Sequence, residues 1–198
     1  MWYRFVQSIF FVIFKIIFRL EIIGRENIPQ KGPLVIASNH ISLLDPPLVG
    51  TASSRPVNFM AKEELFVPIL GDIYKSLGAF PVKRGASDRN AIKNALSILR
   101  AGKVLGIFPE GTRSKTGKLG PAGSGTLGIA SKAKATVVPT AIVGSNLKWQ
   151  KTFWPKIKII FGEPLVFPQD AELGKEELEA MTDKMMERIR NLLENNQL

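Results

Sequence analysis

From Gly24 onward, short apolar runs alternate with segments of helical periodicity, and this alternation limits the fold most strongly. The apolar runs have the length of strands and are too short for buried helices. They predict strands at Leu34–Ser38, Val57–Ala61, Val104–Phe108, Thr136–Val143 and Ile157–Phe161. Strands that alternate with helices need crossover connections, which favour a parallel sheet. We therefore expect an α/β fold with a largely parallel sheet covered by helices.

Two of the intervening segments have clear helical periodicity. The first is expected to begin at a Ser87 cap and end at Gly102, and its apolar side chains share one face. These are Ala91, Ile92, Ala95, Leu96 and Leu99. The second runs from about Leu173 to Leu193, with an apolar face of Leu178, Met181, Met185, Ile189 and Leu192. The acidic side chains of this second helix then form its solvated side.

Charge and rare residues narrow the functional classes. The 198 residues have 27 Lys and Arg against 17 Asp and Glu, and the formal net charge is +10. Such a surface suits nucleic acid, anionic lipid or a phosphorylated substrate, and charge alone does not choose among them. The chain has no cysteine and one histidine, which excludes thiolate metal sites, cysteine nucleophiles and cages of several histidines. Histidine chemistry, if present, must use His40.

The amino-terminal segment is strongly apolar. On a helical wheel of about 100° per residue, its polar side chains fall within an arc of roughly 60°. They are Arg4, Ser8, Lys15 and Arg19, and apolar side chains cover most of the remaining circumference. Lys15 interrupts the run before it reaches the length of about 20 residues that a spanning helix needs. We expect residues 1–22 to form an amphipathic, monotopic membrane-anchoring helix and residues 23–198 a single domain. The alternative is a helix packed on the protein's own core.

His40 follows the predicted strand Leu34–Ser38, at the end of the strand where open α/β sheets place their sites. Asp45 lies five residues later and could not face His40 on a regular helix, so a loop must fold it back. Pro46 favours this because it disfavours helical backbone at Asp45 and suits the first turn of a new helix. We expect a catalytic His–Asp pair, whereas in the alternative Asp45 only caps that helix.

Four short blocks occur in order along the chain. They are Asn39–Asp45 with the pattern NHxxxxD, Gly78–Arg84 (GAFPVKR), Phe108–Ser114 (FPEGTRS) and Val137–Ala141 (VVPTA). Together they resemble the four blocks of the glycerolipid acyltransferases, and specifically those of the 1-acyl-sn-glycerol-3-phosphate acyltransferases. The resemblance spans most of residues 22–168. HxxxxD alone is weak, but its combination with FPEGTR at this separation is specific.

This resemblance implies an enzyme that transfers a fatty acyl group from an acyl thioester to the 2-hydroxyl of lysophosphatidic acid. The donor carrier is acyl carrier protein or coenzyme A, and the product is phosphatidic acid, as in phospholipid biosynthesis. No cofactor and no metal are implied. The partners expected are the two substrates and a membrane surface with anionic lipid, and the location expected is the cytoplasmic face of the cell membrane.

The resemblance also assigns site residues. His40 is expected to act as the general base, and Asp45 to hold its tautomer and stabilise the imidazolium. The other matching positions are expected to bind the acceptor: the phosphate candidates Arg113 and Arg84, the secondary cations Lys62 and Lys83, and the glycerol-binding Glu110 and Gly111. Asn39 is expected to shape the loop rather than to react.

Other classes remain as alternatives. One is an acyltransferase for another lysolipid or for glycerol-3-phosphate, and a thioester hydrolase that uses His40 on water belongs beside it. Another is a basic module that binds anionic lipid or nucleic acid without catalysis. The His40–Asp45 pair disfavours such a module. Nucleic acid is further disfavoured because no stripe of aromatics interleaved with Arg and Lys appears outside the amino-terminal helix.

Overall fold

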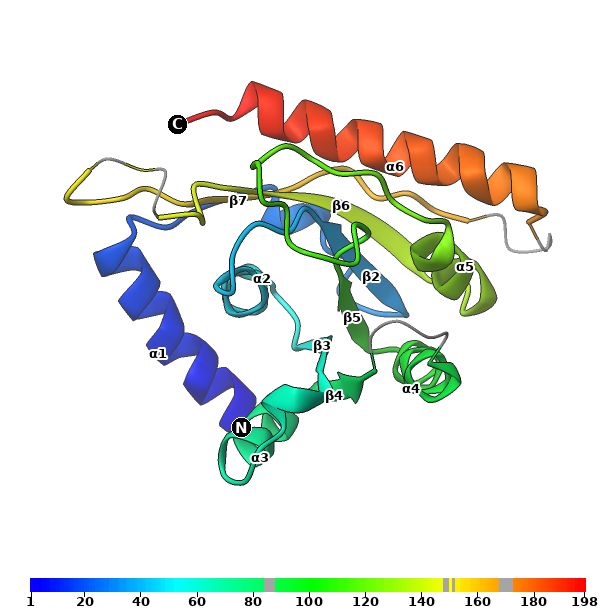
Figure 1. Cartoon of the computed structure of the whole chain (residues 1–198), viewed down its shortest axis with the longest axis horizontal. Coiled ribbons are helices and arrows are strands. Elements are labelled where there is room, and N and C mark those ends of the chain that lie inside the picture. Colours follow the sequence, from blue (N-terminus) through cyan, green and yellow to red (C-terminus); the bar gives the residue numbers. More distant parts are fainter. Residues whose placement is uncertain (84–87, 148–149, 151, 168–172) are drawn as a thin grey trace.

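The structure is a computed structural model that describes residues 1–83, 88–147, 150, 152–167 and 173–198. Within these residues one sheet runs through the molecule, in the strand order β1-β7-β6-β2-β5-β3-β4 (Figure 1). Its strands are β1 (Glu21–Ile23), β2 (Leu34–Ser38), β3 (Val57–Lys62), β4 (Ala79–Val82), β5 (Val104–Ile107), β6 (Thr136–Val143) and β7 (Lys158–Phe161). The β6–β7 pair is antiparallel and the other pairs are parallel. The expected α/β fold with a largely parallel sheet is confirmed.

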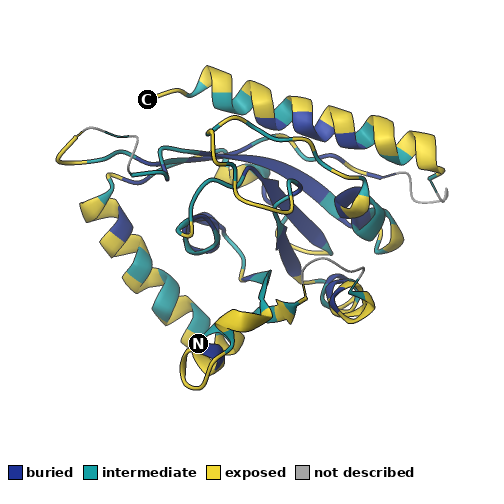
Figure 2. Ribbon diagram, viewed as in Figure 1, coloured by how far each residue is buried: buried dark blue, intermediate teal, exposed yellow. Residues whose placement is uncertain are grey.

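The described helices lie on both faces of this sheet (Figures 1 and 2). They are α1 (Trp2–Ile17), α2 (Asp45–Ala52), α3 (Leu70–Ser76), α4 (Arg89–Arg100), α5 (Gly125–Lys132) and α6 (Lys175–Asn195). One buried cluster joins α1 and α2 to one face of the sheet, through side chains such as Phe14, Leu48 and Ile36. The second joins α4, α5 and α6 to the other face, through Leu99 and Ile189 among others. The sheet is thus the middle layer of three.

The predicted strands are all present, with ends that differ by at most one residue. The edge strands β1 and β4 were not predicted. Each is short, and β4 contains Pro81, which is tolerated at a sheet edge because one side of an edge strand makes no ladder bonds. Helix α4 begins one position later than expected: the Asp88 side chain accepts the N–H groups of Asn90 and Ala91. The predicted cap, Ser87, lies outside the described residues.

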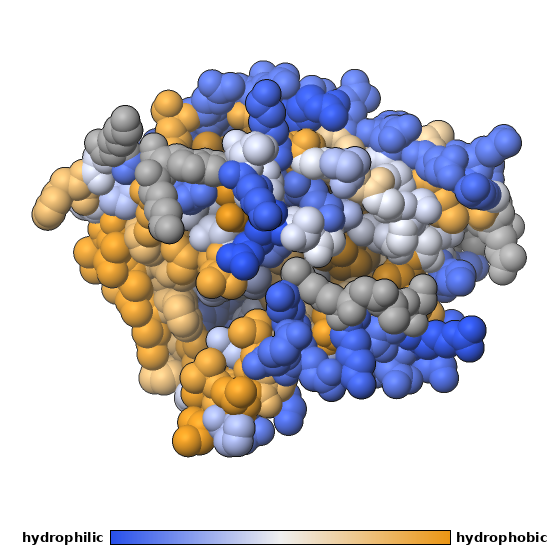
Figure 3. Space-filling model, viewed as in Figure 1, coloured by the Kyte–Doolittle hydropathy of each residue, from blue (hydrophilic) through white to orange (hydrophobic). Residues whose placement is uncertain are grey.

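Helix α1 packs on the domain along one side only. Phe14 is buried in the first core cluster, the Tyr3 hydroxyl accepts the N–H of Val57, and the Gln7 amide donates to the carbonyls of Gly50 and Ser53. The opposite side, which we call the α1 apolar face, is exposed and includes Trp2, Phe5, Ile9, Val12, Ile13 and Ile16. Figure 3 shows apolar atoms gathered over α1 and neighbouring α3. The helix ends at Ile17 and not near residue 22 as expected, because Glu21–Ile23 pair with β7 as strand β1. It has both a core contact and an uncovered apolar face.

None of the described helices is both long enough and apolar enough to cross a bilayer.

Candidate active site

The carboxyl ends of β2 and β5 are neighbours in the sheet, and the loops that follow them build the site. The Asn39–Leu44 loop folds back after β2, so that Asp45, the first residue of α2, meets His40. Asp45 Oδ2 lies 2.8 Å from His40 Nδ1, with an Asp45 side chain of zero exposure and a His40 side chain that is 12% exposed. Pro46 and Pro47 occupy the first turn of α2, where their missing N–H groups have no helical partner to lose.

Asp45 does more than begin a helix. Its Oδ2 atom also accepts the backbone N–H groups of Ile41 at 2.6 Å and Ser42 at 2.7 Å. An oxygen that accepts these two donors is an acceptor toward the imidazole as well, so Nδ1 carries the proton and Nε2 holds the free lone pair. The expected His–Asp pair forms, and its geometry leaves Nε2 as the nitrogen that can take a proton.

An aromatic stack supports the His40 ring. The ring of Phe108 lies parallel to it, with centroids 4.0 Å apart and an interplanar angle of 17°. Phe59 stacks behind Phe108 at 6.1 Å, and it passes over Gly106, where a Cβ atom would collide with the Phe59 ring. Sequence reasoning missed Phe59 and Phe108 as site residues. The signal available for Phe108 was its place at the head of the FPEGTRS block, directly after a strand.

The FPEGTRS loop also makes two hydrogen bonds to the backbone of His40. Glu110 Oε1 accepts the His40 N–H at 2.8 Å, and the Ser114 N–H donates to the His40 carbonyl at 2.8 Å. The second Glu110 oxygen, Oε2, accepts the N–H of Gly120 at 2.8 Å. Both carboxylate oxygens of Glu110 therefore accept backbone N–H groups, and these two hydrogen bonds join the histidine loop to the 108–120 loop.

Asn39 ties the histidine loop to the other neighbouring strand. Its buried amide donates to the carbonyl of Ile142 at 2.9 Å and accepts the N–H of the same residue at 2.7 Å. This reciprocal pair attaches the end of β2 to β6 of the VVPTA block. The geometry agrees with the expectation that Asn39 shapes the loop.

The other predicted residues that the structure describes lie at or after the carboxyl ends of β3, β4 and β5. Gly111 has a φ of +67°, which favours glycine, and nothing lies within 4 Å of a Cβ built there, so conformation rather than space requires it. The Arg113 side chain is exposed. Lys62 ends β3, and the Lys83 ammonium lies 3.9 Å from the Glu63 carboxylate in an exposed pair. Arg84 lies outside the described residues.

Within the described ranges no three His, Cys, Asp or Glu side chains gather closely enough to hold a metal ion.

Comparison with known proteins gives the chemistry a family context. The family model described as Acyltransferase matches residues 19–143, a span that includes all four blocks and the His40–Asp45 pair. The chain belongs to the acyltransferase family. It is therefore an enzyme of this family, and β7 and α6 lie outside the matched span.

Individual relatives are also acyltransferases by name. This acyltransferase is 34% identical over 193 residues to the 1-acyl-sn-glycerol-3-phosphate acyltransferase of Bacillus subtilis, with 96% of each chain covered. It is 30% identical over 131 residues to the protein of the same name from Borreliella burgdorferi, over 65% of this chain and 52% of the relative. Its structure is similar to that of the 1-acyl-sn-glycerophosphate acyltransferase PlsC from Thermotoga maritima. That likeness has a TM-score of 0.75 at 27% identity, and covers 96% of this chain and 80% of the other.

Proposed function

We propose that this acyltransferase transfers a fatty acyl group from an acyl thioester to the 2-hydroxyl of 1-acyl-sn-glycerol-3-phosphate and forms phosphatidic acid. The observation that carries the proposal is the His40–Asp45 pair with its free Nε2, in a chain that matches one relative of this name, from Bacillus subtilis, along almost its whole length. The donor carrier, acyl carrier protein or coenzyme A, stays open.

The geometry supports direct transfer. A secondary alcohol is a weak nucleophile, so His40 Nε2 removes its proton as the oxygen attacks the thioester carbonyl, a contribution of roughly 10²–10⁴ in rate. The tetrahedral intermediate then expels the thiolate, which takes the proton back from the imidazolium. Asp45, held by two backbone N–H groups, keeps the ring in place and stabilises its positive charge. No covalent enzyme intermediate is needed.

In the proposal, cationic side chains bind the acceptor and a carboxylate positions His40. Arg113 and Arg84 bind the acceptor phosphate, because guanidinium is permanently charged and matches phosphate in two-point contact. Lys62 is a secondary cation, and Lys83 is a weaker candidate because Glu63 already lies beside it. Glu110 was expected to bind the glycerol, but both of its oxygens hold backbone, and we now assign it to positioning His40.

The α1 apolar face supports contact with a membrane. Phe5 and Ile16 on this face are 60% and 63% exposed. Burying a large apolar side chain is worth about 1.5–3 kcal/mol, so several of them would bind a bilayer firmly. The proposal places the protein on the cytoplasmic face of the cell membrane, where its lipid acceptor and water-soluble donor meet.

An acceptor panel tests the reaction. Purified protein is incubated with acyl-coenzyme A or acyl-carrier protein and with lysophosphatidic acid, a lysophosphatidylcholine, glycerol-3-phosphate or no acceptor. We expect transfer to lysophosphatidic acid above all others, and a loss of at least about 10²-fold in kcat for a folded His40→Ala variant. Preference for another acceptor, thioester hydrolysis alone, or near-native turnover without His40 would each refute the proposal.

A further inference from the structure

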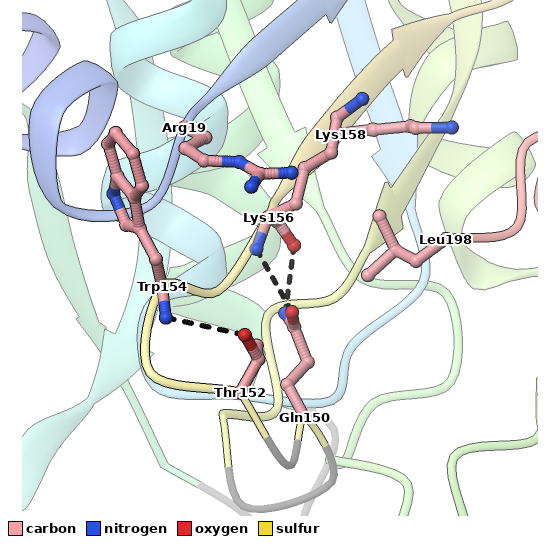
Figure 4. A pocket seen from close by; sticks show the side chains of 7 residues that line it. All are labelled: Arg19, Gln150, Thr152, Trp154, Lys156, Lys158 and Leu198. Atoms are coloured by element: carbon pink, nitrogen blue, oxygen red, sulfur yellow. Dashed lines mark hydrogen bonds between the residues drawn. The ribbon is translucent and has the colours of Figure 1, made fainter.

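A cationic pocket opens where the carboxyl end of α1 meets the connection between β6 and β7. It has a volume of about 260 Å³, and its lining includes Arg19, Trp154, Lys156 and Lys158, with Leu198 on another wall. Figure 4 shows the three cationic side chains gathered between the Trp154 indole and Leu198. Among the residues that the structure describes, none of those predicted to be catalytic or to bind the acceptor lines it.

The pocket keeps an excess of positive charge. The Glu21 carboxylate pairs with Lys156 at 2.7 Å and offsets one of the three cationic side chains. The hydrogen bond from Lys156 lowers the pKa of Glu21, and the charges of Lys156, Lys158 and Lys15 lower it further. Arg19 lies over the Trp154 ring, 5.6 Å from its centroid, and the Lys158 ammonium donates to backbone carbonyls at 3.1 and 3.3 Å. Arg19 and Lys158 thus contact neutral groups and remain available to an anion.

Several contacts hold the pocket wall in place. The Trp154 indole N–H donates to the Ile16 carbonyl of α1 at 2.8 Å. The Gln150 amide donates to two carbonyls, those of Gly144 and Lys156, and accepts the Lys156 N–H. Arg19 has a φ of +44°, a conformation that is unfavourable for a residue with a side chain and is frequent at functional sites. These hydrogen bonds therefore fix the backbone that carries the cationic side chains.

The pocket lies at the margin of the α1 apolar face. Ile13 and Ile16 of the α1 apolar face lead directly to it, and the exposed Phe153 and Trp154 lie beside it. Trp and Arg at the margin of an apolar face are typical of the membrane–water interface, where the ring stays near lipid and the cation reaches phosphate. Lys158 pairs with Val143 at the carboxyl end of β6, so the pocket opens at the sheet edge that also holds the histidine loop.

We propose that this pocket binds the phosphate head group of an anionic bilayer phospholipid. Trp154 and Phe153 contact the lipid surface, and Arg19 and Lys158 bind the phosphate. The inference rests on the proposed membrane contact of α1 and adds a specific head-group site to it.

The test is vesicle binding by the full chain. Affinities are measured for phosphatidylcholine vesicles and for vesicles in which part of this lipid is replaced by phosphatidic acid. The variant Arg19→Gln/Lys158→Gln is compared with Lys93→Gln/Arg100→Gln, which removes the same charge from exposed positions of α4 on the other face of the sheet. Arg19→Gly is a further variant, because glycine suits the φ of this position and should not disturb folding.

We expect the pocket variant to lose roughly thirtyfold in affinity for the anionic vesicles and little for the neutral ones. The α4 variant should lose less than about threefold, and Arg19→Gly should lose several-fold without a fall in Tm. Equal losses for both double variants would overturn the site and leave only a net-charge effect. Binding of the pocket variant to the anionic vesicles with wild-type affinity would overturn the lipid assignment.

Acyl transfer to a short-chain soluble acceptor, measured without vesicles, separates this inference from the proposed reaction. The pocket variant should keep that activity. If no form of the protein transfers an acyl group, the reaction fails while the vesicle affinities still decide the pocket.

Discussion

Replacing Glu110 by Gln tests whether this residue positions the base or binds the acceptor. A carboxylate accepts both the His40 N–H and the Gly120 N–H, each at 2.8 Å. Gln has a single carbonyl oxygen, so its amide N–H₂ must face one of these two donors. One charge-assisted bond is lost, worth about 1.5–3 kcal/mol, and the other becomes neutral, for a total cost of roughly 3 kcal/mol.

The cost is expected to appear in folding and in kcat. If about half of it falls on the histidine loop, kcat drops roughly tenfold, since about 1.4 kcal/mol is a factor of ten. The KM for lysophosphatidic acid should change little, because in this interpretation Glu110 does not touch the acceptor. The assay is steady-state kinetics over a range of acceptor concentrations, with thermal unfolding of the same samples.

Glu63→Gln is the matched control, because this carboxylate is exposed and pairs only loosely with Lys83. It should leave kcat and KM within about twofold of the parent values and Tm within about one degree. A Glu110→Gln variant whose KM rises tenfold while kcat and Tm stay unchanged would refute the positioning role and restore the expected contact with the glycerol.

Four other changes test other parts of the structure. Asp45→Asn should keep its loop, because two backbone N–H donors hold the amide oxygen toward the histidine, yet lose roughly 10²–10³-fold in kcat without the carboxylate charge; unchanged kcat would contradict this. Phe108→Leu removes the aromatic ring stacked on His40 and should lower kcat several-fold with an unchanged KM, as kinetics on lysophosphatidic acid would show. Phe5→Ser/Ile16→Ser should weaken binding to neutral vesicles at least about 10²-fold while Tm stays constant, since both side chains are exposed. Backbone N–H donors, that of Lys83 first, lower the pKa of the Asp88 carboxyl, so its stabilisation is present above the ordinary carboxyl range and lost as pH falls through the lowered value; Asp88→Asn should flatten the acid limb of Tm against pH.

Local patterns were sufficient for the central strands, whereas the spacing of His40 and Asp45 alone left a helix cap as the alternative to a pair. Five strands followed from apolar runs of strand length, because residues buried on both faces of a parallel sheet are apolar without interruption. Pro46 was expected to keep Asp45 out of helical backbone, but Asp45 is the first residue of α2, and the loop of residues 39–44 is what folds back to bring it to His40. The apolar character of α1 around most of its circumference followed from helical periodicity, which depends only on the positions of residues within one helix.

Other features depend on contacts between segments far apart in the chain. The edge strands β1 and β4 have little periodicity of their own, and their partners β7 and β3 define them. The anchored side of α1 was decided by α2 and the sheet, which its wheel does not contain.

The role of Glu110 shows the physical reason most clearly. Its residue type and block suggested a substrate ligand, since a carboxylate with free lone pairs is a good acceptor for a hydroxyl. In the folded chain neighbouring loops bring the backbone N–H groups of His40 and Gly120 to its two oxygens, so each oxygen already accepts one hydrogen bond from the backbone. Sequence alone determined that a carboxylate stands at this position, whereas the packing of β2 beside β5 decided which donors it meets.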